Sequence, residues 1–186
     1  MKNTLLLIHG LPATGKTTLA YWLAQQLQWP IFHKDDIKEI LFDTLGWSTR
    51  ERSRQLGVGV IEILYYAMSA QLSAGVSCII ESNFNAEQSS PRVNAILQKT
   101  SAHCIQVVCH TDEAIRQQRF QARVRHPGHA DSELVATVNA APATPAEVLT
   151  RLAVAGPVIE VDTTDLARVS YADILGQIQM YLDTDQ

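Results

Sequence analysis

Short apolar runs alternate along this chain with longer segments in which apolar residues recur every three or four positions. The short runs predict β-strands at residues 4–9, 30–33, 76–80, 103–109 and 158–161. The longer segments predict helices at residues 16–27, 35–42 and 171–182, a long helix that ends at Gly75, and two helices that begin at Pro91 and after Thr111. This alternation is typical of a three-layer α/β/α fold, in which helices cover both faces of a five-stranded parallel sheet.

Polar signatures predict where several helices begin. Ser48–Glu51 fits a capping box at the start of the long helix, and Thr144–Glu147 fits a second one. Residues 125–143 form the longest stretch without clear periodicity, and long loops in compact domains are often lids. We therefore expect one domain spanning residues 1–186, with a helical lid at about residues 120–145.

The overall composition narrows the class of protein. Hydrophobic residues make up 46% and charged residues 18% of the chain, which excludes a disordered or fibrous protein. The net charge of −4 argues against sequence-independent nucleic-acid binding, although a local basic groove is compatible with it. The apolar runs are too short to span a bilayer and no signal peptide is recognisable, so we expect a cytoplasmic protein without a membrane partner.

The three cysteines are expected to be buried and reduced. Cys78, Cys104 and Cys109 lie in apolar, strand-like segments without Cys-x-x-Cys spacing, which argues against a metal site. Cys104 and Cys109 are five positions apart, so on one strand they would face opposite sides of the sheet.

The most specific motif follows the first predicted strand and precedes a helix. The segment Gly10-Leu11-Pro12-Ala13-Thr14-Gly15-Lys16-Thr17 matches G-x-x-x-x-G-K-[ST] at every fixed position, and Thr18 comes next. Such a loop points main-chain N–H groups at phosphate oxygens, and the helix N-terminus also favours anions. Lys16 is expected to bridge the β- and γ-phosphates, and Thr17 to bind Mg²⁺.

No guanine-reading Asn-Lys-x-Asp motif and no ABC signature occur in the sequence. The chain is also too short for the additional modules of oligomeric motor ATPases. These exclusions favour a kinase that uses ATP and Mg²⁺, with the preference for ATP over GTP left open.

Acidic residues near the ends of two predicted strands are candidates for the acceptor side. Asp35 and Asp36 follow the second strand, at the edge where open α/β sheets bind ligands. We assign Asp35 as the base that accepts the proton of the acceptor hydroxyl, and Asp36 as a helix cap or a helper. Lys38, one helical turn further on, binds an anionic group of the acceptor or is a solvated surface lysine.

The third predicted strand ends in a second acid. Glu81 occupies the position of a Walker-B carboxylate and is expected to bind a Mg²⁺ water or the acceptor hydroxyl; an exposed strand end is the alternative. Asn83 and Asn85 are candidate acceptor contacts or turn formers.

Arginines cluster on one face of the helix that leads into the predicted lid. Arg116, Arg119 and Arg123 are spaced i, i+3 and i+7, and Arg125 follows. We expect Arg119 and Arg123 to close over the transferring phosphoryl group, with a solvated basic face as the alternative. His126 and His129 are interpreted as lid-shaping or phosphate-contacting residues, since two histidines alone make a poor metal site.

These residues resemble a known family. The motif at residues 10–17, the Asp35-Asp36 pair, Glu81-Ser82-Asn83 and Arg119-x-x-x-Arg123 resemble the P-loop kinases of the AAA-33 group, over about residues 5–125. That group includes the kinase domain of polynucleotide 5′-kinase and is similar to chloramphenicol phosphotransferase and zeta-toxin kinases; the run Arg125–His129 resembles its bacterial kinases. The resemblance implies a sheet with strand order 2-3-1-4-5, Lys16 and the arginines on the phosphates, and Asp35 as base.

The chain departs from the polynucleotide kinase pattern at two positions. Lys38 stands where that pattern has Arg, and Glu81 where it has Asp. Lysine lacks the bidentate fork that suits a phosphodiester. The sequence therefore predicts a small-molecule hydroxyl as acceptor, with polynucleotide 5′-hydroxyl kinase and non-catalytic ATP-binding regulator as alternatives.

Overall fold

A computed structural model describes residues 3–129 and 151–184. Its strands form one parallel sheet in the order β2-β3-β1-β4-β5, as predicted. The strands are β1 (Thr4–Gly10), β2 (Ile31–His33), β3 (Cys78–Ser82), β4 (His103–His110) and β5 (Val158–Asp162). Every residue of β1 and β3 is buried, which explains why these strands are continuously apolar over most of their length.

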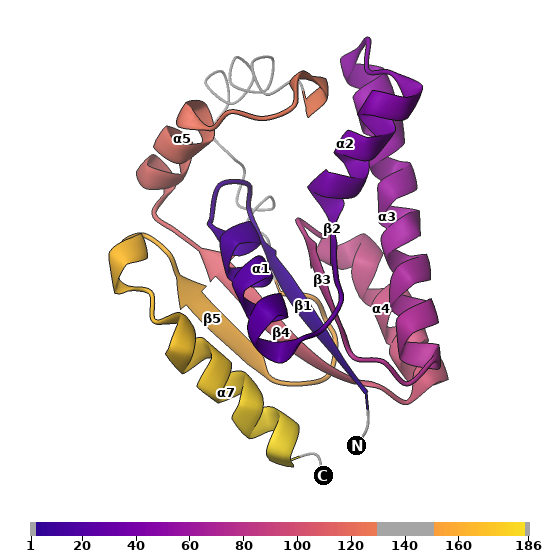
Figure 1. The fold of residues 1–186 in the computed structure, drawn as a ribbon, viewed down its shortest axis with the longest axis vertical. Helices are drawn as coiled ribbons and strands as arrows, with labels where there is room; N and C mark the ends of the chain where they lie inside the picture. Colours follow the sequence, from indigo (N-terminus) through magenta and orange to yellow (C-terminus); the bar gives the residue numbers. More distant parts are fainter. Residues whose placement is uncertain (1–2, 130–150, 185–186) are drawn as a thin grey trace.

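Helices cover both faces of this sheet (Figure 1). They are α1 (Lys16–Leu27), α2 (Lys34–Leu45), α3 (Arg50–Ser73), α4 (Ala86–Thr100), α5 (Glu113–Ala122) and α7 (Tyr171–Thr184), with 3-10 turns η1 (Pro127–His129) and η3 (Leu166–Arg168). The Thr144–Glu147 capping box and most of the predicted lid lie outside the described residues.

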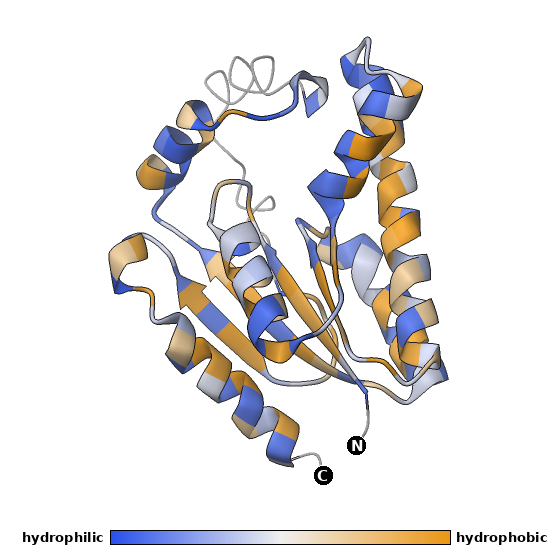
Figure 2. Ribbon diagram, in the orientation of Figure 1, coloured by the Kyte–Doolittle hydropathy of each residue, from blue (hydrophilic) through white to orange (hydrophobic). Residues whose placement is uncertain are grey.

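Two apolar cores separate the layers. One contains Leu6, Ile8 and Cys109 and packs the sheet against α1 and α7. The other contains Leu5, Leu7 and Cys104 and packs it against α3 and α4. Cys104 and Cys109 thus lie on opposite faces, as predicted, and burial raises the pKa of each of the two thiols to about 12. Figure 2 shows apolar colouring along the strands and on parts of the helices that cover them, such as α3 and α7.

Three predicted helix starts are wrong. α4 begins at Ala86 behind the cap Asn85, so Pro91 lies inside the helix and does not start it. α5 is capped by Asp112, whose carboxylate accepts from Ala114 N at 2.9 Å, and not by Thr111. α3 is capped by Thr49, one residue after the predicted Ser48, because the Thr49 hydroxyl accepts from Arg52 N at 3.1 Å.

α3 is the helix of the described residues that is long and apolar enough to suit a membrane span by length and composition. Its 24 residues include eight that are buried, among them Leu64 and Met68. Both side chains belong to the core between the sheet, α3 and α4. Packing within this core accounts for the apolar side of the helix.

The strand ends bring the candidate chemistry together. All five strands are parallel, so their carboxyl ends meet at one edge, between α2 and α5 in Figure 1. In the register of the sheet, Glu81 pairs with Ile8 on one side and with His33 on the other. β3 extends two residues beyond its predicted end, so Glu81 is a buried strand residue and not an exposed strand end.

Candidate active site

The loop between β1 and α1 has the conformation of a phosphate cradle. Ala13 (φ 69°) and Gly15 (φ 76°) adopt the left-handed region, which turns successive N–H groups to one side. A Cβ at Gly10 would lie 2.3 Å from the carbonyl oxygen of Cys109, so only glycine fits there. The Thr14 hydroxyl donates to Leu11 O at 2.9 Å and closes the loop.

Lys16, the first residue of α1, lies over this loop with its side chain almost buried. Its Nζ donates to Leu11 O at 3.3 Å and lies 3.6 Å from Glu81 Oε1. Burial lowers the pKa of Lys16 to about 8, although the charge of Asp35 opposes the shift. A cation that is costly to bury in this way favours an anionic ligand beside it.

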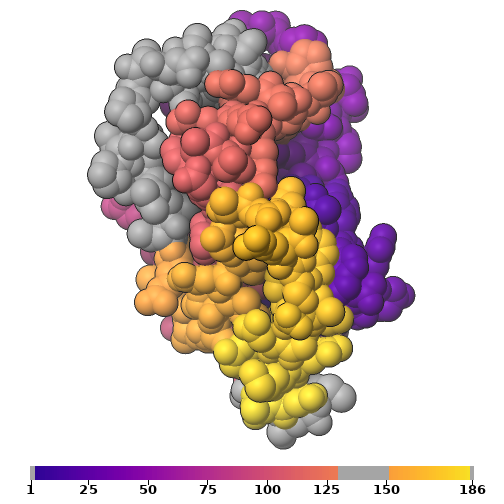
Figure 3. All heavy atoms as spheres, turned by 90° about the vertical axis from the view of Figure 1, so that its left-hand side faces the viewer, coloured from indigo at the N-terminus to yellow at the C-terminus, as the bar shows by residue number. Residues whose placement is uncertain are grey.

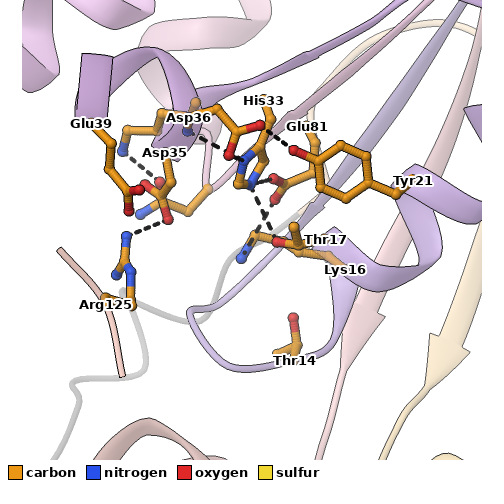
Figure 4. Close-up of polar contacts among 12 residues, drawn as sticks. Thr14, Lys16, Thr17, Tyr21, His33, Asp35, Asp36, Glu39, Glu81 and Arg125 are labelled. Carbon is orange, nitrogen blue, oxygen red and sulfur yellow. Dashed lines mark hydrogen bonds and ion pairs between the residues drawn. The ribbon is translucent and has the colours of Figure 1, made fainter. Parts of the chain in front are cut away.

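A hydrogen-bonded network connects the loop to α2 (Figure 4). His33 is its centre: Nδ1 lies 2.8 Å from Asp36 Oδ1, and Nε2 lies 3.2 Å from the Thr17 hydroxyl and contacts a Glu81 carboxylate oxygen. Tyr21 OH donates to the other Asp36 oxygen. His33 also caps α2, so the predicted capping role of Asp36 falls to His33, and the Asp36 carboxylate turns to His33 and Tyr21.

The carboxylate of Asp35 points away from that network and toward Arg125 (Figure 4). Arg125 Nη2 donates to Asp35 Oδ2 at 2.5 Å. Burial by itself would raise the pKa of Asp35, but the charge of Arg125, helped by His129 and Lys34, outweighs burial and holds this pKa below its usual value. Asp35 is therefore ionised at neutral pH and able to accept a hydrogen bond from a hydroxyl.

The segment Arg125–His129, which we call the docked segment, packs along α2. His129 Nε2 lies 2.9 Å from Glu39 Oε1, and His126 Nε2 lies 3.2 Å from Asp43 Oδ1. Both histidine rings contact Phe42, with centroid distances of 5.1 Å to His126 and 5.2 Å to His129. The docked segment carries Arg125 to Asp35. The roles predicted for the two histidines, lid shaping or phosphate contact, stay predictions.

A cavity of about 150 Å³ opens between the phosphate loop, α2, the end of β3 and α5. Its lining has five cationic side chains against two carboxylates, in a chain of negative net charge. The lining residues are Pro12, Lys16, Lys34, Asp35, Lys38, Glu81, Ser82, Asn83, Phe120, Arg123, Arg125 and His129.

The structure thus brings most of the predicted residues together. Lys16, Asp35, Lys38, Glu81, Asn83, Arg123 and Arg125 all line this cavity. Arg123 directly follows the last residue of α5 and caps the helix, and its guanidinium lies 3.9 Å above the ring centroid of Phe120.

Arg119 is placed elsewhere. Its guanidinium donates to the carbonyl oxygens of Thr163 at 2.9 Å and Thr164 at 3.0 Å, in the loop after β5. Figure 3 shows α5 directly above the loop and turn that follow β5. Arg116 forms a bidentate pair with Glu113 on its own helix, with distances of 2.8 and 2.7 Å. Only Arg123 and Arg125 of the predicted arginines face the cavity among the described residues.

Sequence reasoning missed several residues of the site. Lys34 lines the cavity and donates to Asn83 Oδ1 at 2.6 Å. His33 was assigned only to a strand, yet it contacts Thr17 and Glu81. His9, the residue before Gly10, is fully buried, and burial lowers its pKa to about 4, so its ring is neutral near Lys16. Sequence reasoning could have found His9 and His33, because each is a polar residue at the end of a predicted apolar strand, where the strands reach the active edge of the sheet.

The residues present suit a magnesium nucleotide. No group of three or more His, Cys, Asp or Glu side chains in the described ranges could hold a metal by itself. Mg²⁺ bound with a nucleotide takes only one or two protein ligands and completes its shell with phosphate oxygens and water. The Thr17 hydroxyl and the Glu81 carboxylate, which is 1% exposed, meet at His33 and provide such a partial set.

The sheet order and the phosphate loop define a P-loop fold of the kinase type. The model of the AAA domain family AAA_33 matches residues 5–144, and the chain belongs to this family. The comparison with curated proteins found no match.

Solved structures of similar fold agree with this assignment. A protein from Chloroflexus aurantiacus J-10-fl, provisionally described as a kinase, is 34% identical with a TM-score of 0.86, covering 97% of this chain and 99% of that one. A gluconokinase from Sinorhizobium meliloti 1021 is 15% identical (TM-score 0.51; coverage 98% and 96%). The Mycobacterium tuberculosis APS kinase CysC, solved with AMPPNP and APS, is 15% identical (TM-score 0.59; coverage 98% of both chains). The last two show the fold alone.

Proposed function

We propose that this protein is an ATP- and Mg²⁺-dependent kinase that transfers the γ-phosphate to a hydroxyl of a small molecule. The observation that carries this proposal is that Lys16 and the ionised Asp35 line one cavity, from opposite sides of the active edge of the sheet. The phosphate loop supplies the donor side and α2 the acceptor side. A phosphoryl group and a hydroxyl would meet between them.

Each of the residues has a distinct part in the transfer. The main-chain amides of residues 10–17 and Lys16 hold the triphosphate, and Arg123 lies on the lining where charge spreads during transfer. Thr17 and Glu81 hold Mg²⁺, which neutralises phosphate charge when bound. Asp35 orients the acceptor hydroxyl and takes its proton as the bond from the hydroxyl oxygen to the γ-phosphorus forms, while the bond from that phosphorus to ADP, the leaving group, breaks. Because its pKa is lowered, Asp35 acts mainly by orientation, and it accepts the proton late.

Two variants with matched controls test this function. Lys16→Ala is expected to abolish transfer from γ-labelled ATP, and Asp35→Asn to retain Mg·AMPPNP binding while transfer falls by about 10²–10⁴. Lys99→Ala and Asp183→Asn change exposed residues on α4 and α7 and serve as controls. Transfer by Asp35→Asn at the wild-type rate would refute the role of Asp35.

Two outcomes would support the alternative functions. Efficient labelling of oligonucleotide 5′ ends would support a polynucleotide kinase, and nucleotide binding without transfer to any acceptor would support a regulator.

A further inference from the structure

The acceptor side of the cavity has positively charged side chains that do not belong to the phosphate loop. Lys34 and Lys38 both come from α2, one helical turn apart, and line the cavity opposite Lys16. Lys34 Nζ donates one of its three protons to Asn83 Oδ1. The Asn83 amide nitrogen then remains as a donor on the same lining. The two lysines and Asn83 thus form a donor set separate from the P-loop.

Ser82 adds a buried donor to this set. Its side chain is 1% exposed, lines the same cavity, and its hydroxyl has no hydrogen-bond partner among the described residues. A buried hydroxyl without a hydrogen-bond partner destabilises the protein, because it has lost its hydrogen bonds to water. A ligand that accepts a hydrogen bond from Ser82 would remove this cost.

The electrostatics of Lys34 favour the same kind of ligand. Burial lowers the pKa of Lys34 to about 8, and repulsion from Lys38, Lys16 and Arg125 contributes, against attraction by Asp35. An anion bound beside Lys34 would offset both effects. A neutral ligand would add no negative charge to the attraction that Asp35 already provides.

We propose that the acceptor carries an anionic group, a carboxylate or a phosphate, in addition to the hydroxyl that is phosphorylated. Lys34, Asn83 and Ser82 bind this group, and Lys38 lies beside it. Lys34 and Asp35 line the same cavity of about 150 Å³, so the anionic group and the reactive hydroxyl belong to one compact molecule. This inference rests on the proposed kinase function and names the substrate class of the same site.

Matched sets of acceptors test it. Glucose, gluconate and glucose 6-phosphate, and likewise glycerol, glycerate and glycerol 3-phosphate, are offered with γ-labelled ATP. We expect transfer to anionic members and not to their neutral counterparts, and the members used show whether the group is a carboxylate or a phosphate. For an acceptor that is used, Lys34→Ala should raise KM by about tenfold to a hundredfold, as expected for the loss of a charge-assisted hydrogen bond. The Kd of the Lys34→Ala variant for Mg·AMPPNP should stay within about twofold of the wild-type value. Lys99→Ala is the control and should change neither constant.

A second measurement does not depend on finding the acceptor. Inorganic sulfate is titrated into protein saturated with Mg·AMPPNP, which occupies the phosphate loop. Sulfate binding that is lost in Lys34→Ala and weakened in Ser82→Ala supports the inference. Equal sulfate binding by wild type and Lys34→Ala, or neutral acceptors used as well as anionic ones, overturns it while the kinase function stands. If no Mg-nucleotide binds at all, the proposed function fails, and sulfate binding to the free wild type and Lys34→Ala still decides whether the anion subsite exists.

Discussion

Arg125 and Asp35 are 90 positions apart in the chain and form an ion pair across the cavity, with 2.5 Å between Nη2 and Oδ2. The contact joins the docked segment to the first turn of α2. It fixes the orientation of the proposed base and keeps its carboxyl ionised. Four predictions follow from this pair and from the contacts around it.

Arg125→Ala should move the acidic limb of the kcat/KM profile to higher pH. Asp35 now has a lowered pKa because the attraction of Arg125 outweighs burial. Without Arg125, burial prevails and the pKa rises, so the carboxyl is protonated at a higher pH. Because its pKa is lowered in the folded protein, Asp35 also adds to the free energy of unfolding at pH values above its unfolded-state pKa, and this contribution is lost as the pH falls. The contribution should be smaller in Arg125→Ala. Arg92→Ala breaks the exposed Arg92–Glu62 pair and is the control; an unchanged acidic limb in Arg125→Ala would contradict the assignment.

His33→Asn should raise the Mg²⁺ concentration needed for nucleotide binding and activity. The imidazole contacts both Thr17 and Glu81, so it holds the two proposed metal ligands in position. Without it, neither ligand is held in place, and the buried Glu81 carboxylate loses one of its partners. The free energy of unfolding should fall by about 1–3 kcal/mol. Calorimetry with AMPPNP, with and without Mg²⁺, measures the effect. Tyr21→Phe removes only the outer contact to Asp36 and should have a smaller effect; equal Mg²⁺ dependence in wild type and His33→Asn would refute the role of His33.

Gly128→Ala should release the docked segment. A Cβ there would lie 2.6 Å from Phe42 Cδ2 and 2.7 Å from Cγ, so the ring or the segment must move. We expect a loss of about 1–3 kcal/mol in thermal denaturation, together with a higher KM for the acceptor. Gly59→Ala, inside α3 where nothing lies within 4 Å of the new Cβ, should instead stabilise by about 0.5–1 kcal/mol. The explanation is wrong if both variants change stability in the same direction.

Nucleotide binding should take up protons at pH 8.5. Burial lowers the pKa of Lys16 in the free protein to about 8, so the lysine is mostly neutral at this pH. Phosphate charge beside Lys16 raises its pKa again, and uptake should approach about three quarters of a proton. Affinity should consequently weaken as the pH rises through 8. Calorimetry with AMPPNP in buffers of different ionisation enthalpy gives the number of protons; release, or no exchange at all, would contradict the prediction.

The apolar runs predicted the strands well, because burial on both faces leaves a local signal in consecutive apolar residues. The order of the strands came from the family resemblance and is confirmed. The sequence predicted helix starts less well. Pro91 and Thr111 are residues typical of a first turn, but the caps actually used are Asn85 and Asp112, whose carbonyl or carboxylate oxygens accept from amides two or three residues further on. A local pattern offers several caps, and packing of the whole helix selects among them.

The sequence likewise predicted one part of the candidate site, the phosphate loop, better than it predicted the position of Arg119. The phosphate loop was readable because one continuous segment makes it, and its spacing is dictated by main-chain geometry. The assignment of Arg119 beside Arg123 relied on helical spacing, on the predicted lid that follows and on the family resemblance, but the structure places the Arg119 guanidinium on the carbonyl oxygens of Thr163 and Thr164. Helical spacing says which residues share a face, but not what that face meets.

From the sequence alone came the phosphate loop, the parallel sheet and the presence of acids and arginines near its active edge, since each depends on residues close together in the chain. Only the tertiary structure decided that His33 meets Glu81 across the β2–β3 register, that the docked segment carries Arg125 to Asp35, and that Lys34 shares a cavity with Ser82. These contacts join residues that are far apart in the chain and meet only in the folded protein. Such long-range contacts produce no local or periodic pattern in a single sequence.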